Sequence, residues 1–337
     1  MEAYKVFQLG VAYTQSLLAY HTNGKPRPFS ASFAVTNKCN LRCVYCNCPN
    51  LKTDELNLDQ IDLLFKKLKK MGVLRLGIFG GEPMVRKDIG EIVHLAKKYD
   101  FFISLNSNLL LYDRFKDELD PVDYFFTSLD GTPEKHFANR GKHNYNTILT
   151  SIREIVKRGQ KVTAICVVTE PDMDSVEYLL DLAVRENIDI HFQAECYDAE
   201  KAGRSADENM GQQEVRNFWL NLLEKKKQGA PITSSAAYLN YVSKWSDYKS
   251  TTMYDPNVSC AAGKGFLFVE SSGYAYPCAY IKGQDGVEGI NLLQDEWSEK
   301  FNSNTPCTKC IVGPLLEFNL LFHKPISAAM AALSKAY

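Results

Sequence analysis

Residues 32–46 read SFAVTNKCNLRCVYC, a short apolar, β-rich run that leads directly into three cysteines. Cys39, Cys43 and Cys46 have the spacing Cys-x3-Cys-x2-Cys, in a loop just beyond the predicted strand. Thiolates are the ligands that iron–sulfur clusters select. Three thiolates on a cluster of four irons leave one iron without a protein ligand, and a substrate or cofactor can bind there and accept electrons. The loop therefore predicts a 4Fe–4S cluster with one open iron.

A zinc site is the alternative for this loop, because zinc also binds thiolates. Structural zinc takes four ligands, usually from two Cys-x2-Cys pairs, and Cys48 is the nearest candidate for a fourth thiolate. The Cys-x-Cys spacing of Cys46 and Cys48 is awkward for that geometry. Iron–sulfur chemistry is therefore favoured over zinc.

The composition indicates a globular protein whose cysteines are reduced. The chain has 337 residues, ten cysteines and a net charge of −1, which gives no electrostatic reason to expect nucleic acid as a partner. No secretory signal opens the sequence, and no stretch approaches the ~20 uninterrupted apolar residues of a membrane-spanning helix. We expect a cytoplasmic location, where grouped cysteines are more often metal ligands than disulfides.

Around this loop, short apolar runs alternate with longer segments of helical period. The predicted strands cover residues 31–36, 74–79, 101–106, 122–129, 161–168 and 188–194. The predicted helices between them cover residues 58–71, 87–99, 111–118, 144–158 and 174–187. This alternation indicates an α/β fold with a parallel sheet covered by helices. Six units are too few for a closed eight-stranded barrel, so we predict a partial (β/α)6 TIM-like barrel with its site at the carboxyl ends of the strands.

Two further motifs fall at predicted strand ends. Residues 78–83 read IFGGEP, where two glycines let the backbone approach a ligand closely and the glutamate suits an ammonium group. Residues 127–131 read TSLDG and are followed by Arg140-Gly141. Asn106 and Asn108 follow the third strand, and they either face the site or cap local backbone.

The cysteine spacing, the aromatic Tyr45 before the last cysteine and the Gly-Gly-Glu-Pro loop together resemble the radical S-adenosylmethionine (radical SAM) superfamily. The resemblance implies that the cluster binds S-adenosylmethionine and that the Gly-Gly-Glu-Pro loop holds its amino group. It also implies that polar side chains at the fourth strand end face the nucleotide, and Asn106 at the third strand end is placed to face the same site. The residues expected to bind this cofactor are Gly80, Gly81, Glu82, Pro83, Asn106, Ser128 and Asp130.

A second group of cysteines lies in a turn-rich segment near the C-terminus. It resembles the SPASM extension of this superfamily, or its shorter twitch form, and the four thiolates imply one fully ligated auxiliary 4Fe–4S cluster. Zinc remains open as an alternative because the ligand count suits it equally. The expected ligands are Cys260, Cys278, Cys307 and Cys310. Of the other cysteines, Cys166 is expected in the core, and Cys196 is a less favoured candidate radical partner.

The predicted domain organisation follows from these motifs. It comprises an N-terminal helical extension (1–28), the radical SAM partial barrel (29–200), a helical linker (201–255), the auxiliary cluster domain (256–313) and an apolar C-terminal tail (314–337). We expect both apolar ends to pack on the barrel. The alternative is a peripheral contact with the inner face of a membrane, or an entrance for a lipid-like substrate.

The resemblance implies an enzyme that reductively cleaves S-adenosylmethionine to a 5′-deoxyadenosyl radical, which abstracts hydrogen from a substrate. A flavodoxin- or ferredoxin-like protein would supply the electron. Only about 30 residues precede the first strand, too few for a peptide-recognition module, so we expect a small-molecule or lipid-linked substrate. A peptide- or protein-modifying maturase is the second enzyme hypothesis. A non-catalytic electron carrier or a zinc-binding protein is the alternative of another class.

Overall fold

The computed structural model describes residues 2–22, 25–141, 144–195, 212–244, 260–282, 286–301, 310 and 312–323 of the protein. The chain divides into two compact units. The first unit contains residues 1–40, 48–125 and 261–307, and the second contains residues 41–47, 126–260 and 308–337. Cys39 therefore belongs to the first unit, whereas Cys43 and Cys46 belong to the second.

The first unit contains a mostly parallel sheet with the strand order β3-β2-β1-β7-β8-β9. β1 pairs in parallel with both β2 and β7, and β2 pairs in parallel with β3. β8 pairs antiparallel with β7 on one side and with β9 on the other. The strands are β1 (Ser30–Thr36), β2 (Arg75–Gly80), β3 (Phe102–Asn106), β7 (Phe266–Val269), β8 (Tyr274–Tyr276) and β9 (Ile290–Asn291).

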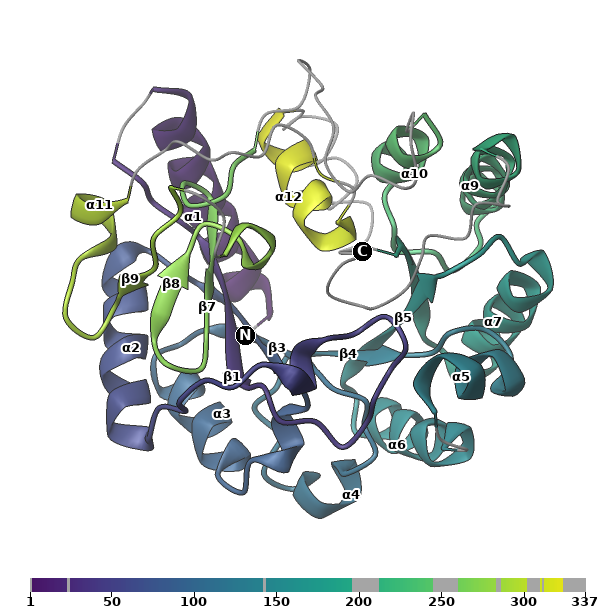
Figure 1. Ribbon diagram of the computed structural model, residues 1–337, viewed down its shortest axis with the longest axis horizontal. Helices are drawn as coiled ribbons and strands as arrows, with labels where there is room; N and C mark the ends of the chain where they lie inside the picture. The colour runs from purple at the N-terminus through teal and green to yellow at the C-terminus, as the bar shows by residue number, and fades with distance from the viewer. Residues whose placement is uncertain are drawn as a thin grey trace. The chain divides into compact units, whose positions relative to one another are not determined.

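Helices cover one face of this sheet (Figure 1). Aromatic side chains pack between helix and sheet. The ring of Phe65 on α2 makes edge contacts with Phe33 of β1 and with Phe101, at centroid distances of 6.1 and 5.6 Å. α2 begins where Asn57 and Gln60 form a capping box, and it ends at Gly72 in the left-handed conformation. The helices are α1 (Glu2–His21), α2 (Leu58–Met71), α3 (Ile89–Lys98), α4 (Tyr112–Phe115) and α11 (Trp297–Lys300), with 3₁₀ turns at Cys48–Asn50, Pro83–Val85 and Ala279–Ile281.

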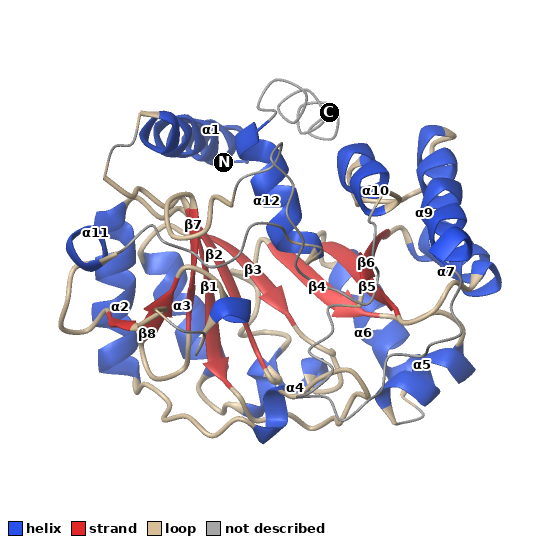
Figure 2. Cartoon of the chain, turned by 45° about the horizontal axis from the view of Figure 1, so that its top comes forward, coloured by secondary structure: helices blue, strands red, loops and turns tan. Residues whose placement is uncertain are grey.

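The second unit contains the strand order β4-β5-β6, with helices against its strands (Figure 2). β5 and β6 are parallel, and Cys166 stands opposite Phe192. β4 (Tyr124–Ser128) begins in the first unit and ends in the second. The other elements are β5 (Lys161–Val168), β6 (Asp189–Ala194), α5 (Pro133–Arg140), α6 (Tyr145–Lys157), α7 (Met173–Glu186), α9 (Gln212–Lys227), α10 (Ala236–Val242) and α12 (Gly313–His323).

All six predicted barrel strands are confirmed to within two residues at each end. The predicted helix over 111–118 is wrong in length, because only Tyr112–Phe115 is helical. α5 was not predicted. It has a short, polar sequence with little apolar periodicity, and its boundaries depend on the Thr132 cap and on Gly141 in the left-handed conformation. The proposed domain boundaries stay a prediction.

Within the described part of the chain, no helix is both long enough and apolar enough to span a bilayer. α1 has the length of a span, but its side chains are mixed in polarity.

Candidate active site

The segment before Cys39 is held by the Gly80-Gly81 turn of the same unit. The amide of Gly81 donates to the carbonyl of Thr36, and the amide of Glu82 donates to the carbonyl of Lys38, both at 2.8 Å. A Cβ on Gly80 would lie 2.1 Å from the Thr36 oxygen, and a Cβ on Gly81 would lie 2.3 Å from the Lys38 oxygen. The two loops can therefore lie in contact only because both positions are glycine.

Glu82 fixes the next loop to this arrangement. Its carboxylate is buried, and it accepts hydrogen bonds from the Ser107 hydroxyl (2.7 Å), the Asn108 amide (2.7 Å) and the Met84 amide (3.0 Å). Burial raises the pKa of Glu82, and these three donors oppose that shift. The Asn108 side-chain amide donates in turn to Asn40 at 2.7 Å. Glu82 and Asn108 therefore connect the loops that follow β1, β2 and β3.

The Cys43–Cys46 part of the loop lies against the end of α5 in the second unit. The Val44 amide donates to the Asn139 carbonyl at 2.9 Å, and the Cys46 amide donates to the Cys43 carbonyl at 3.1 Å. The hydroxyl of Tyr45 donates to Asp130 at 2.6 Å. The backbone and the aromatic side chain of this segment are thus both anchored.

A buried ion pair lies beside it. The Arg140 guanidinium donates through Nε and Nη2 to the two carboxylate oxygens of Asp130, at 2.9 and 3.1 Å. The two side chains are 8% and 0% exposed. Burial alone would lower the pKa of Arg140, but the charges of Asp130, Tyr45 and Cys43 and the hydrogen bonding to Asp130 together outweigh it and raise that pKa, so the guanidinium stays charged. Its remaining nitrogen, Nη1, lies 3.9 Å from the sulfur of Cys43.

A neutral histidine supports the Asp130 loop. The Asp130 amide donates to Nδ1 of His136 at 3.3 Å, and Nε2 of the same ring lies 3.2 Å from the Asn144 side-chain oxygen. Burial, and next the charge of Arg140, lower the pKa of His136 to about 4. The ring is therefore uncharged near neutral pH, which suits a group that accepts a hydrogen bond through Nδ1.

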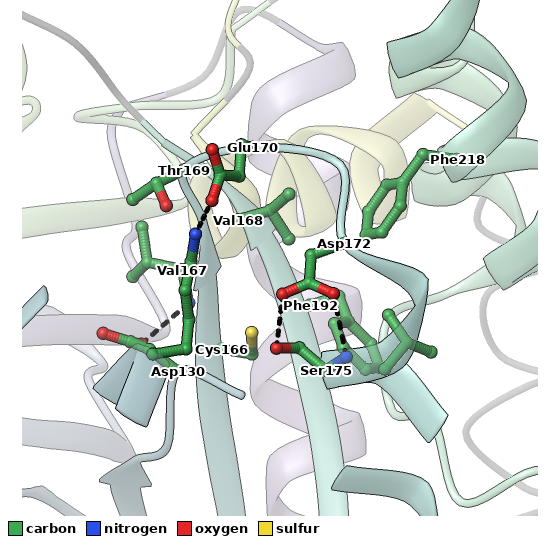
Figure 3. Close-up of a pocket in the computed structure, with 12 residues that line it drawn as sticks. Asp130, Cys166, Val167, Val168, Thr169, Glu170, Asp172, Ser175, Phe192 and Phe218 are labelled. Atoms are coloured by element: carbon green, nitrogen blue, oxygen red, sulfur yellow. Dashed lines mark hydrogen bonds and ion pairs between the residues drawn. The ribbon is translucent and has the colours of Figure 1, made fainter. Parts of the chain in front are cut away.

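A small pocket lies at the carboxyl end of β5, among Val168, Phe192 of β6 and Phe218 of α9 (Figure 3). The pocket is partly open, and the space between its lining residues is about 280 Å³ with the open solvent included. Lys135 and Glu170 form an ion pair at this pocket, and Figure 3 shows Asp172 turned toward Ser175 at the start of α7.

Cys166 also lines the pocket, and burial raises the pKa of its thiol well above the ordinary value. The prediction that Cys166 belongs to the core is confirmed, because its side chain is buried on β5. The sequence did not reveal the pocket itself, since its residues come from elements far apart in the chain.

The comparisons with known proteins agree with this geometry. The family model described as the radical SAM superfamily matches residues 33–183, which include the three-cysteine loop and the Gly-Gly-Glu-Pro turn. Residues 33–183 therefore form a radical SAM domain. A GTP 3′,8-cyclase of Clostridium botulinum is 24% identical over 73% of this chain and 80% of its own length. The mycofactocin maturase MftC of Mycolicibacterium smegmatis is 29% identical over 50% of this chain and 45% of its own length.

A solved structure with a similar fold is SuiB of Streptococcus suis bound to the precursor peptide SuiA. The similarity has a TM-score of 0.65 at 15% identity, over 81% of this chain and 64% of that one. This chain therefore spans less than two thirds of the SuiB chain. At that identity the comparison concerns the fold alone, and it confirms the predicted α/β class with a partial barrel. With this radical SAM domain the chain is an enzyme, and the domain family implies a 4Fe–4S cluster and S-adenosylmethionine.

The residues of the cysteine loop suit the cluster that the family implies. The segment 37–47 carries three cysteines, Lys38 and Arg42, but no acidic residue, and cations near a thiol favour the thiolate that binds iron. The side-chain amide nitrogen of Asn139 is buried and has no hydrogen-bond partner among the described residues. Buried donors are seldom left unpaired, so this nitrogen suits an acceptor such as a cluster sulfur. Within the described ranges, no three His, Cys, Asp or Glu side chains are grouped closely enough to hold a metal by themselves.

The structure positions the other predicted site residues without testing their roles. Asn106 is exposed at the end of β3, Ser128 is half-buried at the end of β4, and Pro83 begins a 3₁₀ turn. The Asp130 carboxylate accepts hydrogen bonds from Arg140, from the Tyr45 hydroxyl and from the Val167 amide. Their cofactor contacts stay predictions.

The predicted auxiliary ligands are distributed over both units. Cys278 is buried in the first unit, and its sulfur accepts a hydrogen bond from the Tyr280 amide. Cys260 and Cys310 are half-buried and belong to the second unit. Cys307, like Cys196, lies outside the described residues. The auxiliary cluster therefore stays a prediction.

Proposed function

We propose that this radical SAM enzyme binds a 4Fe–4S cluster through Cys39, Cys43 and Cys46 and acts on a small-molecule substrate. The cluster and S-adenosylmethionine together supply the reductive cleavage that yields methionine and a 5′-deoxyadenosyl radical. The chain itself binds and orients the nucleotide, and its partial barrel shields the reacting atoms from water. A flavodoxin- or ferredoxin-like protein supplies the electron.

One observation carries the proposal. Two motifs about 40 residues apart in sequence have their backbones joined by the bonds from Gly81 to Thr36 and from Glu82 to Lys38. A loop that holds a cluster and a loop that holds the amino group of its nucleotide must lie close together, because the nucleotide binds to the open iron. An electron carrier without a nucleotide site has no need of this arrangement.

The auxiliary cysteines complete the proposal. Cys260, Cys278, Cys307 and Cys310 would ligate a second 4Fe–4S cluster fully, in the manner of the twitch form. The similarity to the maturase MftC supports an auxiliary cluster in this protein. Asn106, Ser128 and Asp130 are proposed to border the nucleotide at the ends of their strands.

Iron analysis tests this assignment. After anaerobic reconstitution the wild type is expected to hold about eight irons per chain, and Cys39→Ala/Cys43→Ala/Cys46→Ala is expected to hold about four. The wild type is also expected to release 5′-deoxyadenosine in the presence of dithionite, whereas the triple variant releases none. Absence of iron in the wild type would end the proposal. Four irons in the wild type and none in the variant would leave the C-terminal cysteines with zinc or with no metal.

A small molecule is favoured as substrate because the similarity to the GTP 3′,8-cyclase extends over 80% of that protein. The second candidate is a peptide, which the sequence similarity to the maturase MftC supports. The reconstituted enzyme separates the two when cell-extract fractions are tested for stimulation of deoxyadenosine release. A low-mass fraction that resists protease supports the small molecule, and a protease-sensitive stimulator supports the peptide. A stimulator that partitions into chloroform indicates a lipid-linked substrate.

We also propose a peripheral contact of α1 with the inner face of a membrane. Phe7, Val11 and Leu18 lie within about 40° of one another on this helix and are 68%, 41% and 60% exposed. The stretch from residue 6 to residue 20 contains no charged side chain. An exposed apolar helix face of this kind suits the interface between lipid headgroups and acyl chains.

Vesicle flotation tests this contact. Wild-type protein is expected to float with phosphatidylglycerol-containing vesicles, and Phe7→Ser/Leu18→Ser is expected to lose most of that binding. Val184→Ser is the matched control, because Val184 is 72% exposed on a different helix. Failure of the wild type to float, or equal loss in the control, would contradict the proposal.

A further inference from the structure

α5 ends directly against the cysteine loop. The Asn139 carbonyl accepts the Val44 amide, and Nη1 of Arg140 lies 3.9 Å from the Cys43 sulfur. All of these residues belong to the second unit. The guanidinium is therefore a cation that lies within hydrogen-bonding range of one of the proposed cluster ligands.

The orientation of Arg140 is fixed on several sides. Two of its nitrogens are bound by the two oxygens of Asp130, and its guanidinium lies 5.5 Å from the centre of the Tyr45 ring. Asp130 is held in turn by the Val167 amide at 3.2 Å and by the Tyr45 hydroxyl at 2.6 Å. With Nε and Nη2 occupied, Nη1 is the nitrogen that remains to donate toward sulfur.

The Asp130–Arg140 ion pair is not needed to anchor the cysteine loop. The Val44 amide bond and the Tyr45 hydroxyl already attach the loop to α5 and to Asp130. Burying two opposite charges seldom adds net stability relative to apolar side chains of the same volume. A buried arginine that directs an N–H at a ligand sulfur can instead change the reduction potential of a bound cluster.

We propose that Arg140 raises the reduction potential of the cluster through its N–H donation to the Cys43 sulfur, with Asp130 holding it in that direction. The inference rests on the proposed function. Potentials of iron–sulfur clusters depend on net charge, solvent exposure and hydrogen bonds to the sulfurs. Reduction adds one electron from the flavodoxin- or ferredoxin-like donor, and a donor N–H in a low-dielectric site stabilises that added negative charge. Asp130 offsets much of the positive charge, so the directed N–H carries the effect.

The test is a redox titration of reconstituted protein that is monitored by electron paramagnetic resonance. The signal measured is the one that changes when S-adenosylmethionine is added, because it belongs to the cluster that binds this cofactor. Arg140→Gln is expected to lower the midpoint potential, so that the ratio of reduced to oxidised cluster at a fixed poise falls about tenfold, or ~59 mV for one electron. Arg140→Lys keeps the charge but not the forked geometry, and it is expected to fall between wild type and Arg140→Gln.

Arg42→Gln is the matched control. Arg42 is adjacent to Cys43 in sequence but is exposed, so solvent screens its charge and the potential is expected to move far less. Asp130→Asn/Arg140→Gln removes both charges together and leaves no unpaired buried charge, so it replaces Arg140→Gln if the single variant does not fold. Its potential is also expected to lie below that of the wild type.

The outcomes separate the two proposals. A variant that holds the wild-type amount of iron with an unchanged midpoint potential would overturn the role of Arg140 and leave the cluster assignment intact. A shift of equal size in Arg42→Gln would also overturn it, because net charge alone would then explain the effect. A wild-type protein without iron would instead refute the proposed function.

Discussion

Gly81→Ala is expected to remove most of the cluster-binding capacity and to destabilise the first unit by about 3 kcal/mol or more. The added methyl group would lie 2.3 Å from the Lys38 oxygen and 2.5 Å from the Asn37 oxygen, which are backbone atoms that no side-chain rotation can move away. The two loops must then separate, and the bonds from Gly81 to Thr36 and from Glu82 to Lys38 would break. Iron content after reconstitution and the urea midpoint followed by circular dichroism measure the two effects.

Gly10→Ala is the control for this substitution. Gly10 lies within α1, and a Cβ there would meet no atom within 4 Å. Alanine is favoured over glycine inside a helix by about 1 kcal/mol, so the control should be neutral or slightly more stable. If Gly81→Ala retained the wild-type iron content and urea midpoint, the close contact between the two loops would not be needed for the site.

The sequence was sufficient to predict the strands and the places where the motifs occur. Strand period and cysteine spacing are local properties, so the run into Cys39 and the Gly80-Gly81 turn could be located without a structure. The glycine pair was expected to let a ligand approach. The structure shows an additional reason for it, because the same absence of side chains lets the turn lie against the backbone of residues 36–38.

The role of Glu82 could not be predicted in the same way. Its partners Ser107 and Asn108 lie about 25 residues away, and nothing local connects a carboxylate to a loop beyond the next strand. The sequence suggested an interaction with an ammonium group, which stays a prediction. The carboxylate already accepts three hydrogen bonds. Its position is therefore fixed before any ligand binds.

The Asp130–Arg140 pair shows the same limit. The TSLDG motif drew attention to Asp130 as a residue facing the nucleotide, and Arg140 was noted only as following it. Their pairing depends on α5, a short polar helix whose boundaries come from its caps rather than from apolar periodicity. An ion pair formed across such a helix is a tertiary feature, and it becomes visible only once the helix has been positioned.

Asp130→Ala is therefore expected to be among the most destabilising single changes in the second unit. It leaves the Arg140 guanidinium, 8% exposed, without its counter-charge, and it removes the acceptor of the Tyr45 hydroxyl. Breaking a buried pair from one side typically costs about 3–5 kcal/mol, because the remaining charge stays buried and uncompensated. The free energy of unfolding from urea titration at neutral pH measures this loss.

Two further variants distinguish a buried charge from a simple loss of contact. Glu224→Ala breaks the exposed pair between Glu224 and Lys227, whose side chains are about 60% exposed, and it should change stability by ~0.5 kcal/mol at most. Asp130→Asn/Arg140→Gln removes both charges at the buried site, and it should be more stable than Asp130→Ala although it carries two substitutions. If the double variant were the less stable of the two, the uncompensated charge would not be the cause, and the hydrogen bonds to Tyr45 and Val167 would account for the stability of this loop.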